Sequence, residues 1–290
     1  MKILYYTSGV TGSGRIVSGI AIANALKRRN IECEYVILSS SNFAFLAGEI
    51  RHIEIPIEDE HALSAAHCRD SMLYKTITGI NPDVLLVDLQ WFTLHHFIDE
   101  LPCKKIFLSR QVHDRFFAIP LPNEKLVFRP ESYNRVLATE PFASAIPMER
   151  INPIVIRNRD EILPGDAART RLNLDGNRQT CLFSFNGHPG DFERVRKSYS
   201  YLGDIYNMIY TTNYKDGGLF PVVDYFNAFD FIVCGAGYNQ FWEVIYFDKE
   251  AVFEPTRKIF EDQARRIREC QEYYFDVNGA DQLADMIIRI

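Results

Sequence analysis

One local pattern constrains the fold of this chain more than any other feature: a strand, a glycine loop, a helix and a second strand follow one another at its start. Residues 2–7 are an apolar run of strand length, and residues 8–14 form a loop that contains three glycines. Apolar side chains then recur at helical spacing from Ile16 to Leu26, before a second apolar run at residues 34–38. This order is typical of the first unit of a parallel, doubly wound α/β sheet.

The alternation continues toward the middle of the chain. Residues 60–80 have helical periodicity. Three apolar runs have the length of buried strands: residues 82–88, 105–109 and 135–139. Four prolines then fall within residues 141–165, a density that favours a domain junction. Because 290 residues suffice for two domains, we expect an N-terminal domain at residues 1–150 and a C-terminal domain at residues 151–290.

A second set of strands and helices follows the junction. The strands expected in this half are residues 180–185, 206–210, 231–234 and 251–253, with a short strand or turn at 222–226. The helices expected are residues 191–201, a segment that starts near residue 239, and residues 261–273 and 280–290. The sequence therefore predicts two doubly wound, Rossmann-like parallel sheets that face a cleft, with the last helix able to pack back on the N-terminal domain.

Charge and cysteine content exclude several classes of function. The net charge of −6 argues against a basic surface for nucleic acid. The six cysteines lie far apart without a C-x-x-C pair, which argues against a zinc site or a redox motif and favours reduced thiols. The apolar runs are too short to span a membrane, and the first strand leaves no room for a signal peptide. We therefore expect a cytoplasmic protein that binds no metal.

The first glycine loop nearly matches two nucleotide-binding motifs and satisfies neither. Arg15 stands where a phosphate-binding loop has lysine, and Ile16 replaces the hydroxyl group that would bind Mg²⁺. The dinucleotide fingerprint also fails, because its third glycine is absent and serines, not an acid, follow the second strand. An NTPase and a nicotinamide-dependent enzyme are both disfavoured. Gly12, Ser13 and Gly14 form either a ligand loop or only a tight turn.

The second glycine loop is more informative. Residues 231–234 lead into residues 235–237 (Gly-Ala-Gly), and a helix is expected from Asn239. The free backbone N–H groups at the start of a helix favour a bound phosphate. Glu243 lies on the first turns of that helix, where it either accepts hydrogen bonds from two ribose hydroxyls or is an ordinary solvated or capping acid. Further on, Asp262 either faces sugar hydroxyls or caps the next helix.

These segments together resemble the nucleotide-sugar glycosyltransferases of the GT-B fold, most of all family 28, the MurG-like enzymes. Residues 235–243 occupy the place of the family's H-A-G-x-N-T-x-x-E motif, and residues 261–263 occupy that of its D/E-D/H-Q motif. Residues 151–155 are similar to the family's T-G-N-P-V, and residues 11–15 stand where the family has T-G-G-H. The resemblance covers most of the chain.

The resemblance implies a donor site in the C-terminal domain. Glu243 would hold the ribose, Gln263 the donor sugar and the turn at 235–239 the diphosphate, while the backbone near Val222 and Val223 would meet the base. The donor-binding residues implied in this way are Asn186, Gly187, His188, Gly235, Ala236, Gly237, Tyr238, Asn239, Glu243, Asp262 and Gln263.

The N-terminal domain would carry the acceptor and the catalytic base. The family's histidine in the first loop is Arg15 here, which is no base at neutral pH but can bind phosphate or an acidic acceptor. Asp88 and His113 are the other candidates, because each follows a strand of this domain. Asp88 would equally cap a helix, and His113 would equally be a surface residue.

The activity that the resemblance implies is transfer of a sugar from a nucleotide sugar, with UDP favoured, to an acceptor hydroxyl. Inversion without a metal ion or other cofactor is expected. The alternatives are a nucleotide-sugar hydrolase or epimerase of the same fold, and a catalytically silent nucleotide-sugar-binding protein. Phe43, Phe45 and Leu46 are suited either to peripheral membrane contact or to the core.

Overall fold

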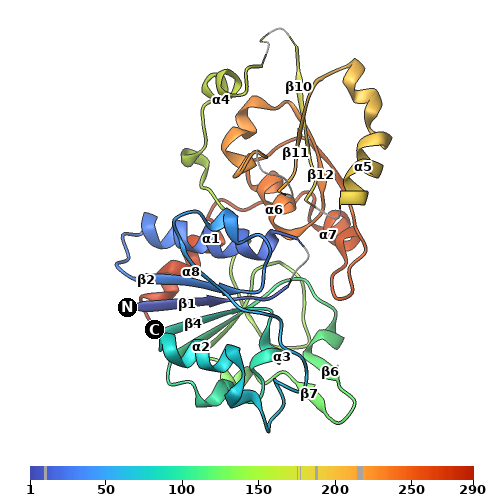
Figure 1. The fold of residues 1–290 in the computed structure, drawn as a ribbon. Coiled ribbons are helices and arrows are strands. Elements are labelled where there is room, and N and C mark those ends of the chain that lie inside the picture. Colours follow the sequence, from blue (N-terminus) through green and yellow to red (C-terminus); the bar gives the residue numbers. More distant parts are fainter. Residues whose placement is uncertain (10–11, 175, 177, 187–188, 214–217) are drawn as a thin grey trace.

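Two parallel sheets organise the chain (Figure 1). The computed structural model describes residues 1–9, 12–174, 176, 178–186, 189–213 and 218–290. The first sheet has seven strands in the order β3-β2-β1-β4-β5-β8-β9. Its strands are β1 (Lys2–Tyr6), β2 (Glu34–Ser39), β3 (Arg51–Glu54), β4 (Val84–Asp88), β5 (Lys104–Ser109), β8 (Arg135–Ala138) and β9 (Glu149–Arg150). A separate antiparallel pair, β6 (Ala118–Pro120) and β7 (Lys125–Val127), lies beside this sheet.

The second sheet has four parallel strands in the order β11-β10-β12-β13. They are β10 (Thr180–Ser184), β11 (Asn207–Thr211), β12 (Phe231–Gly235) and β13 (Ala251–Glu254). Every strand of the first sheet precedes every strand of the second, and the two sheets occupy opposite ends of the molecule (Figure 1). Two Rossmann-like sheets are therefore present, as the sequence predicts, whereas the division at residue 150 stays a prediction.

Helices cover both sheets, and the last helix returns to the N-terminal half. The helices are α1 (Gly14–Arg28), α2 (Met72–Ile80), α3 (Trp91–Leu94), α4 (Gly165–Arg171), α5 (Pro189–Ser198), α6 (Tyr238–Tyr246), α7 (Gln263–Cys270) and α8 (Gly279–Ile287). The last helix, α8, returns to the N-terminal half and packs on α1 (Figure 1). An ion pair joins the two helices: Arg28 Nη2 of α1 lies 2.7 Å from Oδ1 of Asp281 on α8.

The helix α1 is buried because it lies between the first sheet and the C-terminal half. Its apolar side chains at Ile16 and Ile20 are almost fully buried. Gly19 lets the helix lie close to β1, since a Cβ atom at this position would stand 2.9 Å from the Tyr5 ring. The helix ends before Asn30, whose φ of 52° is left-handed. This packing fixes the start of α1 at the edge of the cleft.

Several elements differ from the sequence-based expectation in their bounds or their type. Only Met72–Ile80 of the expected helix at 60–80 is α-helical, because the Ser71 side chain caps it by accepting the Tyr74 N–H at 3.0 Å. Residues 222–226 belong to a 3₁₀ helix, η8 (Val222–Ala228). The strands β3, β6, β7 and β9 have only 2 to 4 residues each, too few for a periodic sequence signal.

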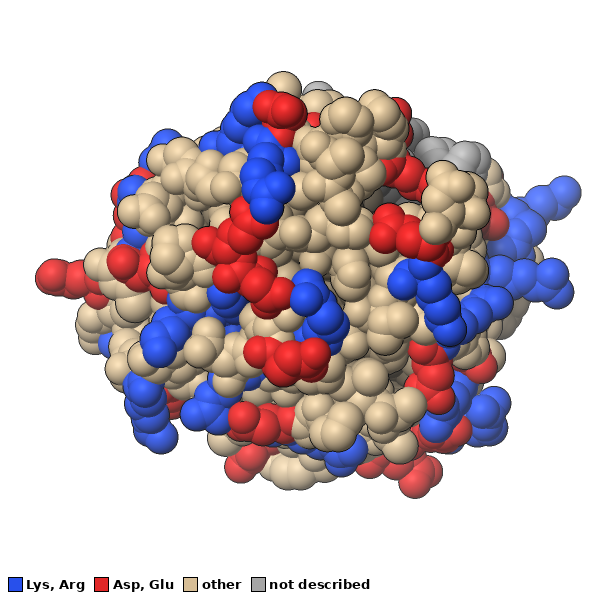
Figure 2. Space-filling view, turned by 90° about the horizontal axis from the view of Figure 1, so that it is seen from below, with Lys and Arg blue, Asp and Glu red and all other residues tan. Residues whose placement is uncertain are grey.

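The surface carries both signs of charge. Acidic and basic side chains are interspersed over the face that Figure 2 shows. No helix among the described residues is long and apolar enough to cross a membrane. Of the three residues suited to membrane contact or to the core, Phe43 is buried, Leu46 is half-buried, and Phe45 is 56% exposed.

Candidate functional site

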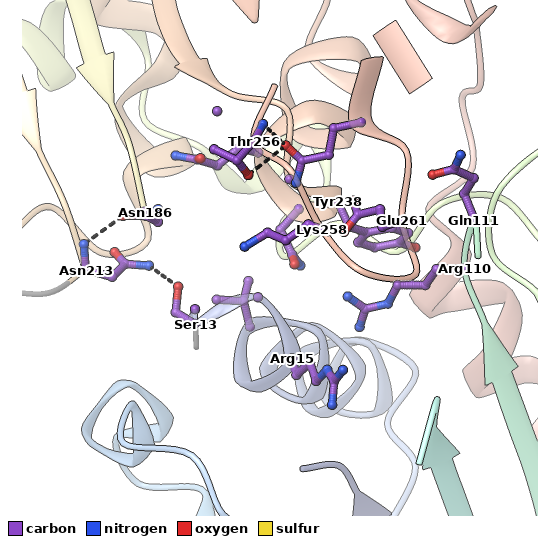
Figure 3. Close-up of a pocket in the computed structure, with 18 of the residues that line it drawn as sticks. Ser13, Arg15, Arg110, Gln111, Asn186, Asn213, Tyr238, Thr256, Lys258 and Glu261 are labelled. Carbon is purple, nitrogen blue, oxygen red and sulfur yellow. Dashed lines mark hydrogen bonds between the residues drawn. The ribbon is translucent and has the colours of Figure 1, made fainter. Parts of the chain in front are cut away.

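A cavity of about 650 Å³ lies where the carboxyl ends of the two sheets face each other (Figure 3). From the first sheet, it is lined by the loop that follows β1 and by Arg110, which follows β5. From the second sheet, it is lined by Asn186 after β10, Gly237 after β12 and residues 256–261 after β13. Loops at the carboxyl ends of parallel strands are the usual ligand site of such folds.

Most of the predicted site residues meet in this cavity. Those that line it are Gly12, Ser13, Gly14, Arg15, Asn186, Gly235, Gly237, Tyr238, Asn239, Glu243 and Gln263. Val222 also lines it, whereas Val223 is fully buried. Ala236, Asp262, Asp88 and His113 are not among the lining residues. Thr11, Gly187 and His188 lie outside the described residues.

Side chains of the C-terminal half contact the first turn of α1 directly. Asn213 donates from Nδ2 to Oγ of Ser13 at 2.8 Å, and its own N–H donates to Oδ1 of Asn186 at 2.7 Å (Figure 3). Asn239 at the start of α6 lies against Gly14, where a Cβ atom would stand 2.9 Å from its Oδ1. The glycine at this position therefore allows the two glycine loops to approach each other across the cavity.

Glu243 is neither a solvated acid nor a helix cap. Its side chain lines the cavity, although only 5% of the residue is exposed, and it has no hydrogen-bond partner among the described residues. Burial raises the pKa of Glu243 to about 8, and the nearby Asp224 carboxylate adds to the increase. Arg157, which is paired with Asp224 at 2.8 Å, opposes it. An unpartnered carboxyl at a cavity wall is suited to accept hydrogen bonds from a ligand.

The two residues that follow Glu261 have different roles. Gln263 lines the cavity, and its Oε1 accepts from the N–H and Oγ1 of Thr256 at 2.8 and 3.1 Å. Its Nε2 amide is left to donate to a ligand. The Asp262 carboxylate instead accepts the Arg265 N–H at 2.9 Å and caps α7. The capping alternative for Asp262 is thus the one that the geometry favours.

Two predicted catalytic candidates do not line the cavity. Asp88 is 1% exposed, and Tyr5 Oη and Arg110 Nη2 both donate to its Oδ2 at 2.5 Å. Arg110 covers it and stacks on the Tyr238 ring at 4.4 Å. His113 is an exposed residue whose backbone N–H donates to the Phe260 carbonyl oxygen at 2.9 Å. Neither side chain has direct access to a ligand in this arrangement.

Arg15 lines the cavity with part of its side chain only. Its guanidinium group donates to the Ser8 carbonyl oxygen and points away from Thr256 and Lys258 (Figure 3). Burial lowers the pKa of Arg15. We therefore see Arg15 as a group that holds the first glycine loop in place.

The sequence placed residues 261–263 at a donor site but did not indicate that the segment 255–262, which we call the strap, joins the two halves. Phe260 packs on Phe116 of the N-terminal half with ring centroids 5.3 Å apart, and Asp262 N–H donates to Oε1 of Gln111 at 3.0 Å. The strap brings Lys258 and Glu261 to the cavity (Figure 3). One sequence signal could have indicated the strap. It is the pair of adjacent cations, Arg257 and Lys258, just before an acid-amide motif.

Comparison with known proteins shows which solved structures have a similar fold. No family model matches the sequence, and no curated protein matches it either. The glycosyltransferase SsfS6 from Streptomyces sp. SF2575, complexed with thymidine diphosphate, is similar at a TM-score of 0.63 and 16% identity over 100% of both chains. The glycosyltransferase SnogD from Streptomyces nogalater is similar at a TM-score of 0.60 and 14% identity, again over 100% of both chains.

A third similar structure is MurG from Acinetobacter baumannii, at a TM-score of 0.52 and 12% identity over 99% of this chain and 91% of that one. At such low identity these likenesses concern the fold. The chain has the GT-B fold of these glycosyltransferases, which confirms the architecture expected from its sequence.

Proposed function

We propose that the protein is a glycosyltransferase that moves a sugar from a nucleoside-diphosphate sugar to an acceptor hydroxyl. The observation that carries this proposal is the buried, unpartnered Glu243 carboxyl at the wall of a cavity between two GT-B sheets. Two vicinal hydroxyl groups of a ribose would satisfy both oxygens of this group, which has no protein donor among the described residues.

The groups around the start of α6 are suited to a diphosphate. Its first residues follow Gly237, whose position offers no side-chain cap, so backbone N–H groups are free to meet an anion. Lys258 extends into the cavity and has no ion-pair partner among the described residues (Figure 3). These positive groups would stabilise the charge on a departing diphosphate. We therefore propose an inverting transfer that requires no metal ion.

Nucleotide binding tests this proposal most directly. The affinities of UDP, 2′-deoxy-UDP, thymidine diphosphate and ADP are measured by titration calorimetry. We expect UDP to bind more tightly than 2′-deoxy-UDP, because removal of one ribose hydroxyl leaves an oxygen of Glu243 without a donor. A protein that binds none of the four nucleotides does not use a UDP, thymidine-diphosphate or ADP sugar, which would contradict the proposal for these donors.

Product analysis then separates the classes of activity. UDP-glucose, UDP-N-acetylglucosamine and thymidine-diphosphate glucose are each incubated with the protein, alone and with a set of hydroxyl-bearing acceptors. A new glycoside identifies a transferase, and a donor cleaved equally fast with and without acceptor identifies a hydrolase. Binding without any turnover identifies a silent binding protein and contradicts the proposal.

A further inference from the structure

The proposed transfer requires a base, and the cavity offers few. Among the described residues that line it, the only carboxylate or imidazole side chains are Glu243 and Glu261. Glu243 is committed to the donor in the proposed function, on which the present inference rests. Asp88 is covered by Arg110, and His113 is not among the lining residues. Glu261 is the carboxylate left to receive a proton.

Glu261 lies on the strap at the junction of the two halves. Its side chain is 25% exposed, and it lines the same cavity as Arg110 and Tyr238 (Figure 3). The preceding residue, Phe260, packs on Phe116, so that the strap is held against the N-terminal half. Glu261 is therefore fixed on the side of the cavity where that half would present an acceptor.

The charge around Glu261 keeps its carboxylate available. Its neighbour Arg266 is already paired with Glu140, because Nε and Nη2 donate to the two Glu140 oxygens at 2.6 and 3.0 Å. Arg266 Nη1 is shared between the Ala236 carbonyl oxygen and Glu261. Two carboxylates thus share one guanidinium, so Arg266 compensates the charge of Glu261 only in part.

An apolar wall adjoins this carboxylate. Phe116 is 4% exposed and lines the cavity together with Val112 and Phe260, while Ile259 of the strap is 73% exposed at its rim. Such a wall would bind the apolar face of an acceptor and bring its hydroxyl group toward Glu261.

We propose that Glu261 is the general base of the transfer, acting on the hydroxyl of an acceptor that lies on this apolar wall. The carboxylate takes the acceptor proton while the hydroxyl oxygen forms a bond to the anomeric carbon. The bond from that carbon to the diphosphate oxygen breaks, and its electron pair leaves with the diphosphate. The proton on Glu261 then passes to water, which reaches the exposed part of the side chain.

Donor cleavage with water as the acceptor tests this role without knowledge of the natural acceptor. The probes are UDP-glucose, UDP-N-acetylglucosamine and thymidine-diphosphate glucose, and released nucleoside diphosphate is measured by chromatography. We expect Glu261→Gln to slow the release by about 100-fold or more and to leave the Kd of the nucleoside diphosphate within about twofold. Glu261→Asp should retain part of the rate. Glu272→Gln, at an exposed acid beyond α7, is the matched control.

A pH profile separates a base from a structural residue. The charged and titratable groups around Glu261 are Lys258 and Asp262 on the strap, Arg266 of α7, Glu140 behind it, and Arg110 and Tyr238. The wild-type rate should fall as the pH is lowered and the carboxylate is protonated, and this decrease should be absent in Glu261→Gln.

Each outcome bears on one proposal. A wild-type protein that binds no nucleotide overturns the proposed function and the role of Glu261 with it. If nucleotide binds but Glu261→Gln releases the diphosphate at the wild-type rate, the role of Glu261 alone is wrong. It is also wrong if bound donor stays intact, since water has access to this side chain.

Discussion

Glu140 and Arg266 form a fully buried ion pair that joins the two halves of the molecule. Glu140 follows β8 and is 1% exposed at its side chain, whereas the Arg266 side chain of α7 is 0% exposed. Trp242 Nε1 and the Gln111 N–H also donate to the Glu140 carboxylate, at 2.8 and 2.6 Å. A carboxylate with this many donors fixes α6, α7 and the strap against the first sheet.

Breaking this pair should destabilise the whole protein. Glu140→Gln leaves the fully buried Arg266 with only the partly exposed Glu261 as a counter-charge, and we expect a loss of up to about 3–5 kcal/mol in the free energy of unfolding. Urea unfolding followed by circular dichroism measures it. Glu149→Gln, which breaks the exposed pair with Arg135, should cost about 1 kcal/mol or less. Equal losses in the two variants would contradict the assigned role of the buried pair.

The donor site should depend on the Glu243 carboxyl. Glu243→Ala is expected to weaken UDP binding by about 10- to 100-fold, since two hydrogen bonds to a neutral carboxyl contribute roughly 0.5–1.5 kcal/mol each. The affinity for 2′-deoxy-UDP should change less, because that ligand lacks one of the two donors. Titration calorimetry on both ligands measures the difference. Unchanged UDP affinity would remove Glu243 from the site, and Glu250→Gln, at an exposed acid, is the control.

The same carboxyl should make stability depend on pH in a defined direction. Burial raises the pKa of Glu243 from its ordinary value of 4.5 to about 8, so the folded chain holds this proton more tightly than the unfolded chain. The stabilisation that this raised pKa adds to the free energy of unfolding is fully present below pH 4.5 and is lost as the pH rises toward 8.

The variant Glu243→Gln isolates this effect. As the pH rises, the wild type should lose stability relative to the variant. The difference between their unfolding free energies should change by up to about 1.4 kcal/mol per pH unit. Urea titrations at half-unit steps across this range measure it. A difference that stays constant, or that shifts in favour of the wild type, would show that Glu243 is ionised in the folded protein throughout.

Lys258 should act on the diphosphate and not on the nucleoside. Lys258→Ala is expected to weaken UDP binding by about tenfold, because it removes a charge-assisted hydrogen bond. Binding of uridine, which has no phosphate, should be unchanged. Lys249→Ala is the control, since Lys249 contacts Asn227 and does not line the cavity. Equal effects on UDP and uridine would indicate that Lys258 has only a structural role.

Local sequence signals were sufficient for most of the fold. Apolar runs gave the long strands β1, β4 and β12, because a strand buried on both faces needs continuous apolar side chains. The glycines that follow β1 and β12 indicated the cavity, since loops at carboxyl ends of parallel strands converge. Short edge strands such as β9 were missed, because two residues carry no periodicity.

The sequence by itself determined that this chain forms parallel α/β sheets and which glycine turns line the cavity between them. The chemistry of the side chains at those turns was decided only by tertiary structure. Asp88 at the end of β4 and Glu261 just before α7 are both carboxylates, yet one is covered by Arg110 and the other lines the cavity. The reason is physical: exposure and charge compensation depend on neighbours distant in sequence, such as the Glu140 that already occupies Arg266.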